Sequence, residues 1–343
     1  FSHLQMTILD TQTNIIVQNL GEWLLPIMNV FSILGVEHFQ LLIISAIFWC
    51  FDRKLGARLG LTLLFASSLN SLMKIAFHLP RPYWIDADVK AYAAEPSFGF
   101  PSGHSQKAAV FWGMLGIQKK RLPSILAAVF LIGMVGTSRL YLGVHFLADV
   151  LGGWLFGLLI LTCVLRLDRP ISRWFEKRPS SIGFILILFT AGFMIVMGIV
   201  AKSFLQDWNI PPDWVTLSAR AGTIHPVSLT GLFSGCGIFI GYAGGLFFLR
   251  NFEARSGIMI KIQGTTEQKL WRLVTGFAGL LLIYSGLGMI LPRDESVIGF
   301  CARLIRFGLT GFWITGLAPL FFLRNKLISQ ETALRVESSL STD

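Results

Sequence analysis

Long apolar runs separated by short polar segments dominate the pattern of this chain. Nine of these runs approach the roughly 20 residues that an α-helix needs to cross a bilayer. They predict transmembrane helices over residues 36–51, 56–79, 103–118, 122–140, 144–165, 182–201, 227–249, 270–291 and 298–323. The first and third runs are short, which favours tilted helices or interfacial extensions. The pattern therefore predicts an all-α fold, a polytopic membrane bundle of about nine transmembrane helices.

The polar stretches beside these runs predict loops and surface segments. Residues 1–35 are interrupted by polar side chains and Pro26, which favours interfacial amphipathic helices; a re-entrant pair or a tenth span is the alternative. Residues 80–101 and 202–226 are polar, aromatic and rich in proline, as is typical of loops. Residues 327–343 form a polar tail, which we expect to fray.

Composition agrees with a membrane protein. The 343 residues are 53% hydrophobic and only 14% charged, whereas soluble domains carry about 25% charged residues. All four cysteines fall inside apolar runs, so we expect small buried side chains rather than disulfides. No spacing of Cys or His suggests a metal site, and we expect no metal and no cofactor.

The positive charges are distributed unevenly along the chain. The net charge is +10, and most Lys and Arg residues follow the first, third, fifth, seventh or ninth run. These positions share one side of the membrane, which the positive-inside rule makes cytoplasmic. We therefore expect an outer amino terminus, a cytoplasmic carboxyl terminus and a bilayer rather than a nucleic acid as the partner.

Three short polar blocks lie at the outer ends of runs. The first contains Lys74 and Arg81. A cation placed within a span costs several kcal/mol by insertion scales, so these side chains either reach the lipid headgroups or face a wet cavity that holds an anion. Arg81 is the better clamp, because a guanidinium can donate to two phosphate oxygens at once.

The second block, Pro101-Ser102-Gly103-His104, lies where a loop becomes a helix. Ser102 is a candidate N-cap, and Gly103 permits close approach of the backbone to a ligand. Free N–H groups at a helix N-terminus favour an anion, beside which His104 would donate or accept a proton. A simple helix cap is the alternative for this block.

The third block joins Ser138-Arg139 to His145 and Asp149. His145 and Asp149 are four residues apart, which places them on one face of a helix. Asp149 would then hold one imidazole nitrogen and leave the other as a free lone pair, as a nucleophile needs. Arg139 reaches the same region across the turn at Gly143. A purely structural His–Asp pair is the alternative.

Taken together, the three blocks resemble the type 2 phosphatidic acid phosphatase (PAP2) superfamily. The family pattern is Lys, six residues, Arg-Pro; then Pro-Ser-Gly-His; then Ser-Arg, five residues, His, three residues, Asp. Every specified position matches in order and spacing. The resemblance covers roughly residues 36–165, a PAP2-type catalytic core. The segment 166–326 would add further transmembrane helices.

The resemblance implies a phosphoric monoester hydrolase that needs no metal. His145 would attack phosphorus and form a phosphohistidine, Asp149 would orient His145, and His104 would protonate the leaving oxygen and then activate water. The phosphate oxygens would be bound by Lys74, Arg81, Ser102, Gly103 and Arg139.

The layout of the chain narrows the resemblance further. A nine-span chain with four spans after the core is similar to the sphingosine-1-phosphate phosphatase and glucose-6-phosphatase branches. Tyr83 and Trp84 follow the first block and either line the mouth of the site as substrate contacts or anchor the chain at the interface. Lys107, one turn after His104, either adds a fourth cation or pairs with an acid.

The leading hypothesis is an integral membrane phosphatase with its site on the non-cytoplasmic face. Its substrate would be an amphiphilic phosphate, either a lipid phosphate monoester or an isoprenoid diphosphate. A glucose-6-phosphatase-like enzyme for a soluble sugar phosphate is the first alternative. A lipid phosphotransferase or a non-catalytic phospholipid binder is the second.

Overall fold

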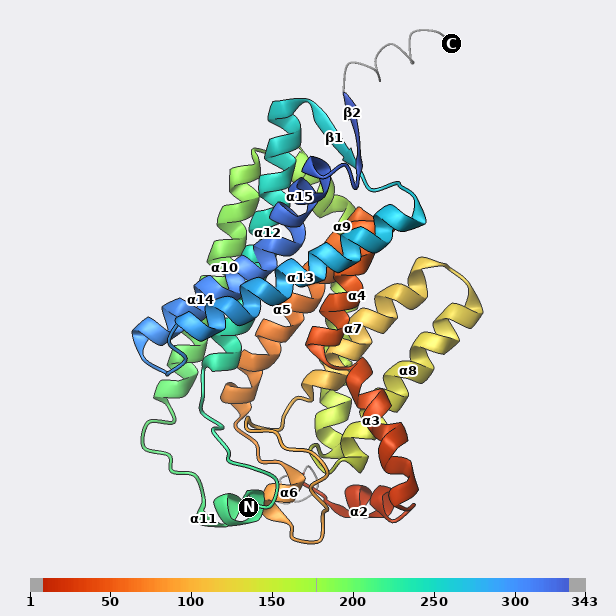
Figure 1. Cartoon of the computed structure of the whole chain (residues 1–343). Helices are drawn as coiled ribbons and strands as arrows, with labels where there is room; N and C mark the ends of the chain where they lie inside the picture. Colours follow the sequence, from red (N-terminus) through yellow and green to blue (C-terminus); the bar gives the residue numbers. More distant parts are fainter. Residues whose placement is uncertain (1–8, 177, 333–343) are drawn as a thin grey trace. The chain divides into compact units, whose positions relative to one another are not determined.

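The computed structural model describes residues 9–176 and 178–332, and almost all of its regular structure is helical (Figure 1). Each predicted run is found as a helix. The helices that correspond to the first eight runs are α4 (Glu37–Cys50), α5 (Arg53–Phe77), α7 (Gly103–Gln118), α8 (Leu122–Tyr141), α9 (Leu147–Glu176), α10 (Ser180–Ser203), α12 (Thr230–Ser256) and α13 (Thr266–Ile290). The ninth run corresponds to α14 (Val297–Phe312), a π-helical turn η2 (Trp313–Leu317) and α15 (Ala318–Arg324). The prediction of an all-α membrane fold is confirmed.

The prediction of nine spans is not confirmed. Seven helices are long and apolar enough to cross a membrane, and the described part of the chain has up to eight if a bent pair counts as one span. The bent pair joins residues Glu22–Leu34 to α4 at an angle of 53°. Helix α7 is missing from this count because its 16 residues rise only about 24 Å, less than the roughly 30 Å of a hydrocarbon core.

Short elements occupy the predicted polar segments. The part of residues 1–35 that the structure describes forms α2 (Gln12–Gln18), η1 (Glu22–Leu24) and α3 (Leu25–Leu34). The loops carry α6 (Pro82–Ile85) and α11 (Pro212–Ser218). One feature was not predicted: β1 (Ile258–Lys261) pairs antiparallel with β2 (Ser329–Thr332), so the start of the polar tail is a strand. Residues 1–8 and 333–343 of the predicted terminal segments lie outside the described residues.

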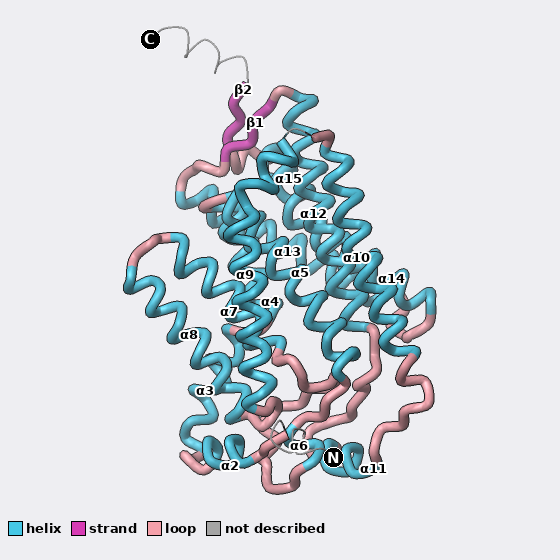
Figure 2. Tube along the Cα trace, turned by 180° about the vertical axis from the view of Figure 1, so that it is seen from behind, coloured by secondary structure: helices cyan, strands magenta, loops and turns pink. Residues whose placement is uncertain are grey.

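The chain divides into two compact units. The first unit comprises Phe1–Gln40, Ala66–Leu167 and Met194–Leu232. Within it, α7 and α8 form an antiparallel pair, and α3 packs along α8 (Figure 1). Loops gather where α6 contacts α11 (Figure 2). An apolar core includes residues of these loops and of the neighbouring α8, among them Trp84, Phe98, Tyr141 and Val144.

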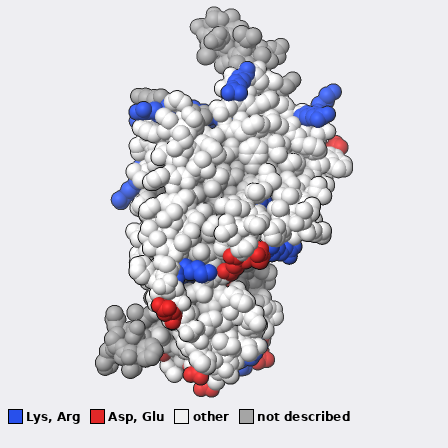
Figure 3. Space-filling model, turned by 90° about the vertical axis from the view of Figure 1, so that its left-hand side faces the viewer, with Lys and Arg blue, Asp and Glu red and all other residues white. Residues whose placement is uncertain are grey.

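The second unit comprises Leu41–Phe65, Asp168–Phe193 and Phe233–Asp343. Helices α12 and α14 cross closely in it: a Cβ on Gly241 would lie 1.8 Å from the Gly308 carbonyl oxygen. Long apolar side chains such as Leu282 and Met289 on α13 are 74% and 83% exposed. Most of the face seen in Figure 3 bears no charged side chain, as expected of a surface that contacts lipid.

Candidate active site

The three sequence blocks converge within the first unit, at ends of helices and in the turns beside them. Their positions are the last turn of α5 for Lys74, the residue before α6 for Arg81, the N-cap and first turn of α7 for Ser102, Gly103 and His104, the last turn of α8 for Arg139, the turn before α9 for His145 and the first turn of α9 for Asp149. Helices α5 and α8 end here and helices α7 and α9 begin here, so side chains distant in sequence meet at one place.

His145 and Asp149 form a buried pair in which both side chains are only 1% exposed. The imidazole Nδ1 lies 3.1 Å from Asp149 Oδ2, and the same oxygen accepts the backbone N–H of Phe146 at 3.0 Å. The two residues do not share a helical face, because His145 precedes the first residue of α9. The carboxylate instead folds back over the helix N-terminus, where the N–H of Phe146 has no intrahelical partner.

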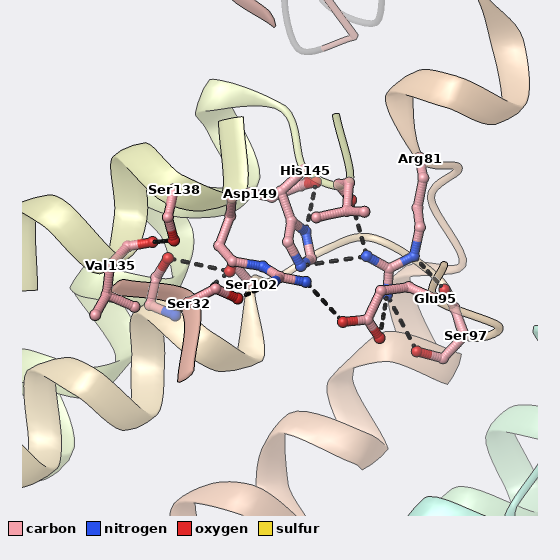
Figure 4. Close-up of polar contacts among 12 residues, drawn as sticks. Ser32, Arg81, Glu95, Ser97, Ser102, Val135, Ser138, His145 and Asp149 are labelled. Atoms are coloured by element: carbon pink, nitrogen blue, oxygen red, sulfur yellow. Dashed lines mark hydrogen bonds and ion pairs between the residues drawn. The ribbon is translucent and has the colours of Figure 1, made fainter. Parts of the chain in front are cut away.

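Arg81 fixes the other side of the imidazole. Its Nη1 lies 3.2 Å from His145 Nε2 and donates to the Val144 carbonyl at 2.8 Å (Figure 4). A guanidinium only donates, so Nε2 is the acceptor and Nδ1 carries the proton that faces Asp149. This is the tautomer in which the free lone pair points toward the cations.

Lys74 lies beside Arg81, and both cations share the same loop residues. Lys74 Nζ donates to Ser97 Oγ at 3.1 Å and to the Phe98 carbonyl at 3.0 Å. Arg81 donates to the Ser97 carbonyl at 2.6 Å, and its Nη2 reaches Ser97 Oγ and the Phe98 carbonyl. The two positive charges are thereby held together by neutral acceptors.

Arg139 approaches from α8 and meets a carboxylate. Its Nη2 donates to Glu95 Oε1 at 2.7 Å, and its Nη1 donates to Ser32 Oγ at 2.6 Å (Figure 4). The other carboxylate oxygen of Glu95 lies 3.9 Å from Arg81 Nη2. Glu95 is therefore the anion that faces the two arginines.

Ser102 caps α7, as its sequence position suggests. Its Oγ accepts from the Ser105 N–H at 3.4 Å and lies 3.0 Å from Ser105 Oγ. A side chain at Gly103 would press against Asn70, since a Cβ there would lie 2.8 Å from Asn70 Oδ1. His104 packs against Gly35, where a Cβ would come within 3.1 Å of the His104 Cβ.

The remaining candidates have structural partners. Lys107 Nζ lies 3.2 Å from Glu37 Oε2, so it pairs with an acid. Tyr83 and Trp84 are 1% and 0% exposed and belong to the apolar core. Contact of these three residues with a substrate stays a prediction.

Sequence reasoning did not single out Glu95 or Asn14. Glu95 was one of several acidic residues in a loop, with no spacing to mark it. Asn14 is fully buried, and its Nδ2 donates to the carbonyls of Leu140 at 2.9 Å and His145 at 3.0 Å. A polar residue among aliphatic ones in α2 was the available signal.

Electrostatics in the loop and turn follow from these contacts. Burial alone would raise the pKa of Glu95, but the Arg81 and Arg139 guanidinium groups outweigh burial and hold that pKa below its usual range. Burial, reinforced by the positive charge of Arg81, holds the pKa of His145 well below its usual range. The carboxylate is therefore ionised and the imidazole neutral at pH 7, which suits a nucleophile.

Two family descriptions match this chain. The PAP2 superfamily matches residues 55–173, which contain all three sequence blocks. The PAP2 superfamily phosphatase transmembrane extension matches residues 233–331. Within the described residues, no group of three or more His, Cys, Asp or Glu side chains is arranged to hold a metal ion.

Curated phosphatases are similar to this chain. Phosphatidylglycerophosphatase B of Bacillus subtilis (strain 168) is 34% identical over 169 residues, 45% of this chain and 80% of that protein. Glucose-6-phosphatase catalytic subunit 1 of Haplochromis nubilus is 26% identical, covering 51% of this chain and 61% of that protein. Sphingosine-1-phosphate phosphatase 2 of Mus musculus is 25% identical, covering 73% of this chain and 68% of that protein.

A solved structure also matches part of the chain. It is the crystal structure of a transmembrane PAP2-type phosphatidylglycerolphosphate phosphatase from Bacillus subtilis, 29% identical, covering 50% of this chain and 89% of that one. The two backbones superpose only loosely, with a TM-score of 0.41. The predicted resemblance in sequence is confirmed by the family matches and the curated relatives.

Proposed function

The chain belongs to the PAP2 superfamily of membrane phosphatases, and on that premise we propose that it hydrolyses a lipid phosphate monoester through a phosphohistidine, without a metal. One observation carries the proposal. A buried imidazole is held by Asp149 at Nδ1, and its Nε2 faces the guanidinium of Arg81. A nucleophilic nitrogen thus lies beside the cations that would bind a phosphoryl group.

In the first step, His145 Nε2 attacks phosphorus and the P–O bond to the lipid breaks. His104 gives a proton to the departing oxygen, so the lipid leaves as a neutral alcohol. Lys74, Arg81 and Arg139 bind the equatorial oxygens and stabilise the charge of the five-coordinate transition state. Ser102 and the N–H of Gly103 would contribute further donors at the N-terminus of α7.

In the second step, the deprotonated His104 takes a proton from water. The water oxygen attacks phosphorus, the N–P bond breaks and inorganic phosphate is released. His145 returns to its neutral form, with Nδ1–H still directed at Asp149. Because every charge is stabilised by side chains, the proposed cycle needs neither a metal nor a cofactor.

A lipid substrate is favoured by the relatives and by the fold. The relative with 34% identity is named for phosphatidylglycerophosphate, and the candidate site lies at ends of helices that are long and apolar enough to cross a bilayer. Similarity to glucose-6-phosphatase over 51% of the chain supports a sugar phosphate as the second candidate.

The test is phosphate release by purified protein from a panel of substrates. The panel comprises phosphatidylglycerophosphate, phosphatidic acid, sphingosine-1-phosphate, an isoprenyl diphosphate and glucose-6-phosphate, with and without EDTA. We expect turnover of lipid monoesters, no effect of the chelator and loss of at least about 10⁴-fold in His145→Ala, because no other residue supplies the nucleophile.

Three outcomes would contradict the proposal. Undiminished activity of His145→Ala would exclude a phosphohistidine intermediate at His145. Strong inhibition by EDTA would show that a metal takes part. A preference for glucose-6-phosphate would assign the enzyme to the sugar-phosphate branch. A folded His145→Ala protein with an unchanged melting temperature serves as the control for structural damage.

A further inference from the structure

The segment Glu95–Phe98 lies in the loop between α6 and α7 and turns its polar groups toward the cations. Glu95 supplies a carboxylate, Ser97 a hydroxyl and a carbonyl, and Phe98 a carbonyl. Lys74, Arg81 and Arg139 are all partnered by these groups. The loop therefore provides the cations with the kinds of oxygen acceptor that a phosphate would provide.

Glu95 is the only one of these groups that carries charge. Its Oε1 is 2.7 Å from Arg139 Nη2, and its Oε2 is 3.9 Å from Arg81 Nη2. Its carboxylate also interacts electrostatically with His104 and Lys74. The proposed phosphate-binding cations and the proposed acid therefore all act on one carboxylate.

A phosphate dianion and this carboxylate compete for the same donors. Guanidinium groups bind carboxylates and phosphates through the same N–H groups. Two anions at contact distance repel one another strongly where few water molecules screen them. The arginines therefore cannot hold both anions in their best geometry.

We propose that Glu95 occupies the phosphate position of the substrate-free site and that the incoming phosphate displaces it. The inference rests on the proposed function, because it concerns the same phosphate site. Displacement frees Arg139 Nη2 and lets Arg81 turn from His145 Nε2 toward the phosphate. Glu95 thus lowers the affinity of the site for anions. Anions that interact only weakly with the arginines do not displace it.

The side chain of Glu95 is placed to move while its backbone stays fixed. Its backbone N–H donates to Tyr83 Oη, and its carbonyl accepts from the same hydroxyl, both at 3.1 Å. The next carbonyl, of Pro96, accepts from the His225 N–H at 3.0 Å. The side chain is 25% exposed, so rotation toward water would not bury the charge in an apolar region.

The alternative is that Glu95 only orients Arg139 for the substrate. The two roles predict opposite effects of removing the charge. A displaced anion weakens phosphate binding, so its removal tightens binding. An orienting partner strengthens phosphate binding, so its removal loosens binding.

The experiment compares wild type with Glu95→Gln, using the purified full chain. Calorimetry gives the dissociation constant of inorganic phosphate, and inhibition assays give that of orthovanadate. We expect both anions to bind about tenfold more tightly to the variant, because a like charge near the anion is removed. The rise in melting temperature with added phosphate should be larger as well.

Two further variants make the result decisive. Glu95→Asp keeps the charge but shortens the side chain, and it should bind phosphate with an affinity between those of wild type and Glu95→Gln. It replaces Glu95→Gln if that protein fails to fold. Glu22→Gln removes an exposed carboxylate that pairs with Lys90, and its phosphate affinity should not change.

Unchanged or weaker anion binding by the Glu95 variants would overturn the inference. Since binding needs no turnover, this result is separable from failure of the proposed function. A wild type that hydrolyses no substrate, while Glu95→Gln binds phosphate more tightly, would leave the inference standing and reject the function. Normal hydrolysis by the wild type, with no tighter phosphate binding by Glu95→Gln, would reject the inference and leave the proposed function standing.

Discussion

At the scale of single residues, one carboxylate oxygen of Asp149 contacts two different partners. Its Oδ2 faces both the His145 imidazole and the Phe146 N–H. The backbone contact fixes the carboxylate, and the fixed carboxylate then selects the tautomer of His145. The orientation of the proposed nucleophile is therefore tied to the N-terminus of α9.

Asp149→Asn should slow turnover by roughly 10² to 10⁴-fold, less than His145→Ala does, because an amide of the same shape keeps the position but no longer favours the same tautomer. Steady-state kinetics with the best lipid substrate would measure the change in kcat. Asp88→Asn, which alters an exposed carboxylate of the same unit, is the matched control. Activity within twofold of wild type would exclude the orienting role.

At the scale of elements, α2 holds the turn that carries His145. Asn14 donates to carbonyls on both sides of this turn, and Gln18 Nε2 donates to Tyr141 and Lys90 carbonyls at 2.8 Å. Gly143 in the turn has φ +76°, and a Cβ there would lie 2.3 Å from the Lys90 carbonyl. A short amphipathic helix thus supports the proposed nucleophile through two buried amides.

Asn14→Ala should lower stability by about 1–3 kcal/mol, because it removes the side-chain donor of the His145 carbonyl, whereas the Leu140 carbonyl keeps the N–H of Gly143. It should also lower kcat, since the turn at His145 loosens. Thermal unfolding and kinetics measure the two effects, and Ile16→Ala, at a residue 64% exposed on the same helix, should change neither. A stable variant with full activity would show that α2 does not position the site.

At the scale of the whole chain, the positive charges on two helices indicate the side of the membrane on which the site lies, whatever the total number of spans. Helix α5 carries Arg53, Lys54 and Arg58 at its start and leads to the site at its end. Helix α9 begins at the site and carries Arg166 and Arg169 toward its end. Both helices are candidate spans, and the positive-inside rule gives the same answer for each.

We therefore expect the site on the non-cytoplasmic face. Sealed right-side-out vesicles should cleave a membrane-impermeant phosphate ester at the rate that detergent-opened vesicles show. Inverted vesicles serve as the control and should be silent until they are opened. Cleavage that requires opening of right-side-out vesicles would invert the orientation and place the site in the cytoplasm.

The sequence predicted the positions of the helices more accurately than the number of helices that cross the membrane. Each apolar run became a helix because a polar backbone inside lipid must satisfy its own hydrogen bonds. Hydropathy did not predict how many of these helices are long enough to cross a bilayer, because α7 has only 16 residues. The strand pair β1–β2 escaped prediction because its two partners lie about 70 residues apart, and nothing local specifies such a pairing.

Apolar run length and motif spacing are local properties, so the family, the all-α membrane class and the residue types of the candidate site can be inferred from the amino-acid sequence. Which of these groups face one another depends on how the helices and loops pack. Glu95 lies 44 residues from Arg139 in sequence but 2.7 Å away in space, and Asn14 reaches a carbonyl 131 residues away. Such contacts arise from the packing of α2, α7, α8 and the loop before α7, which no spacing in the chain encodes.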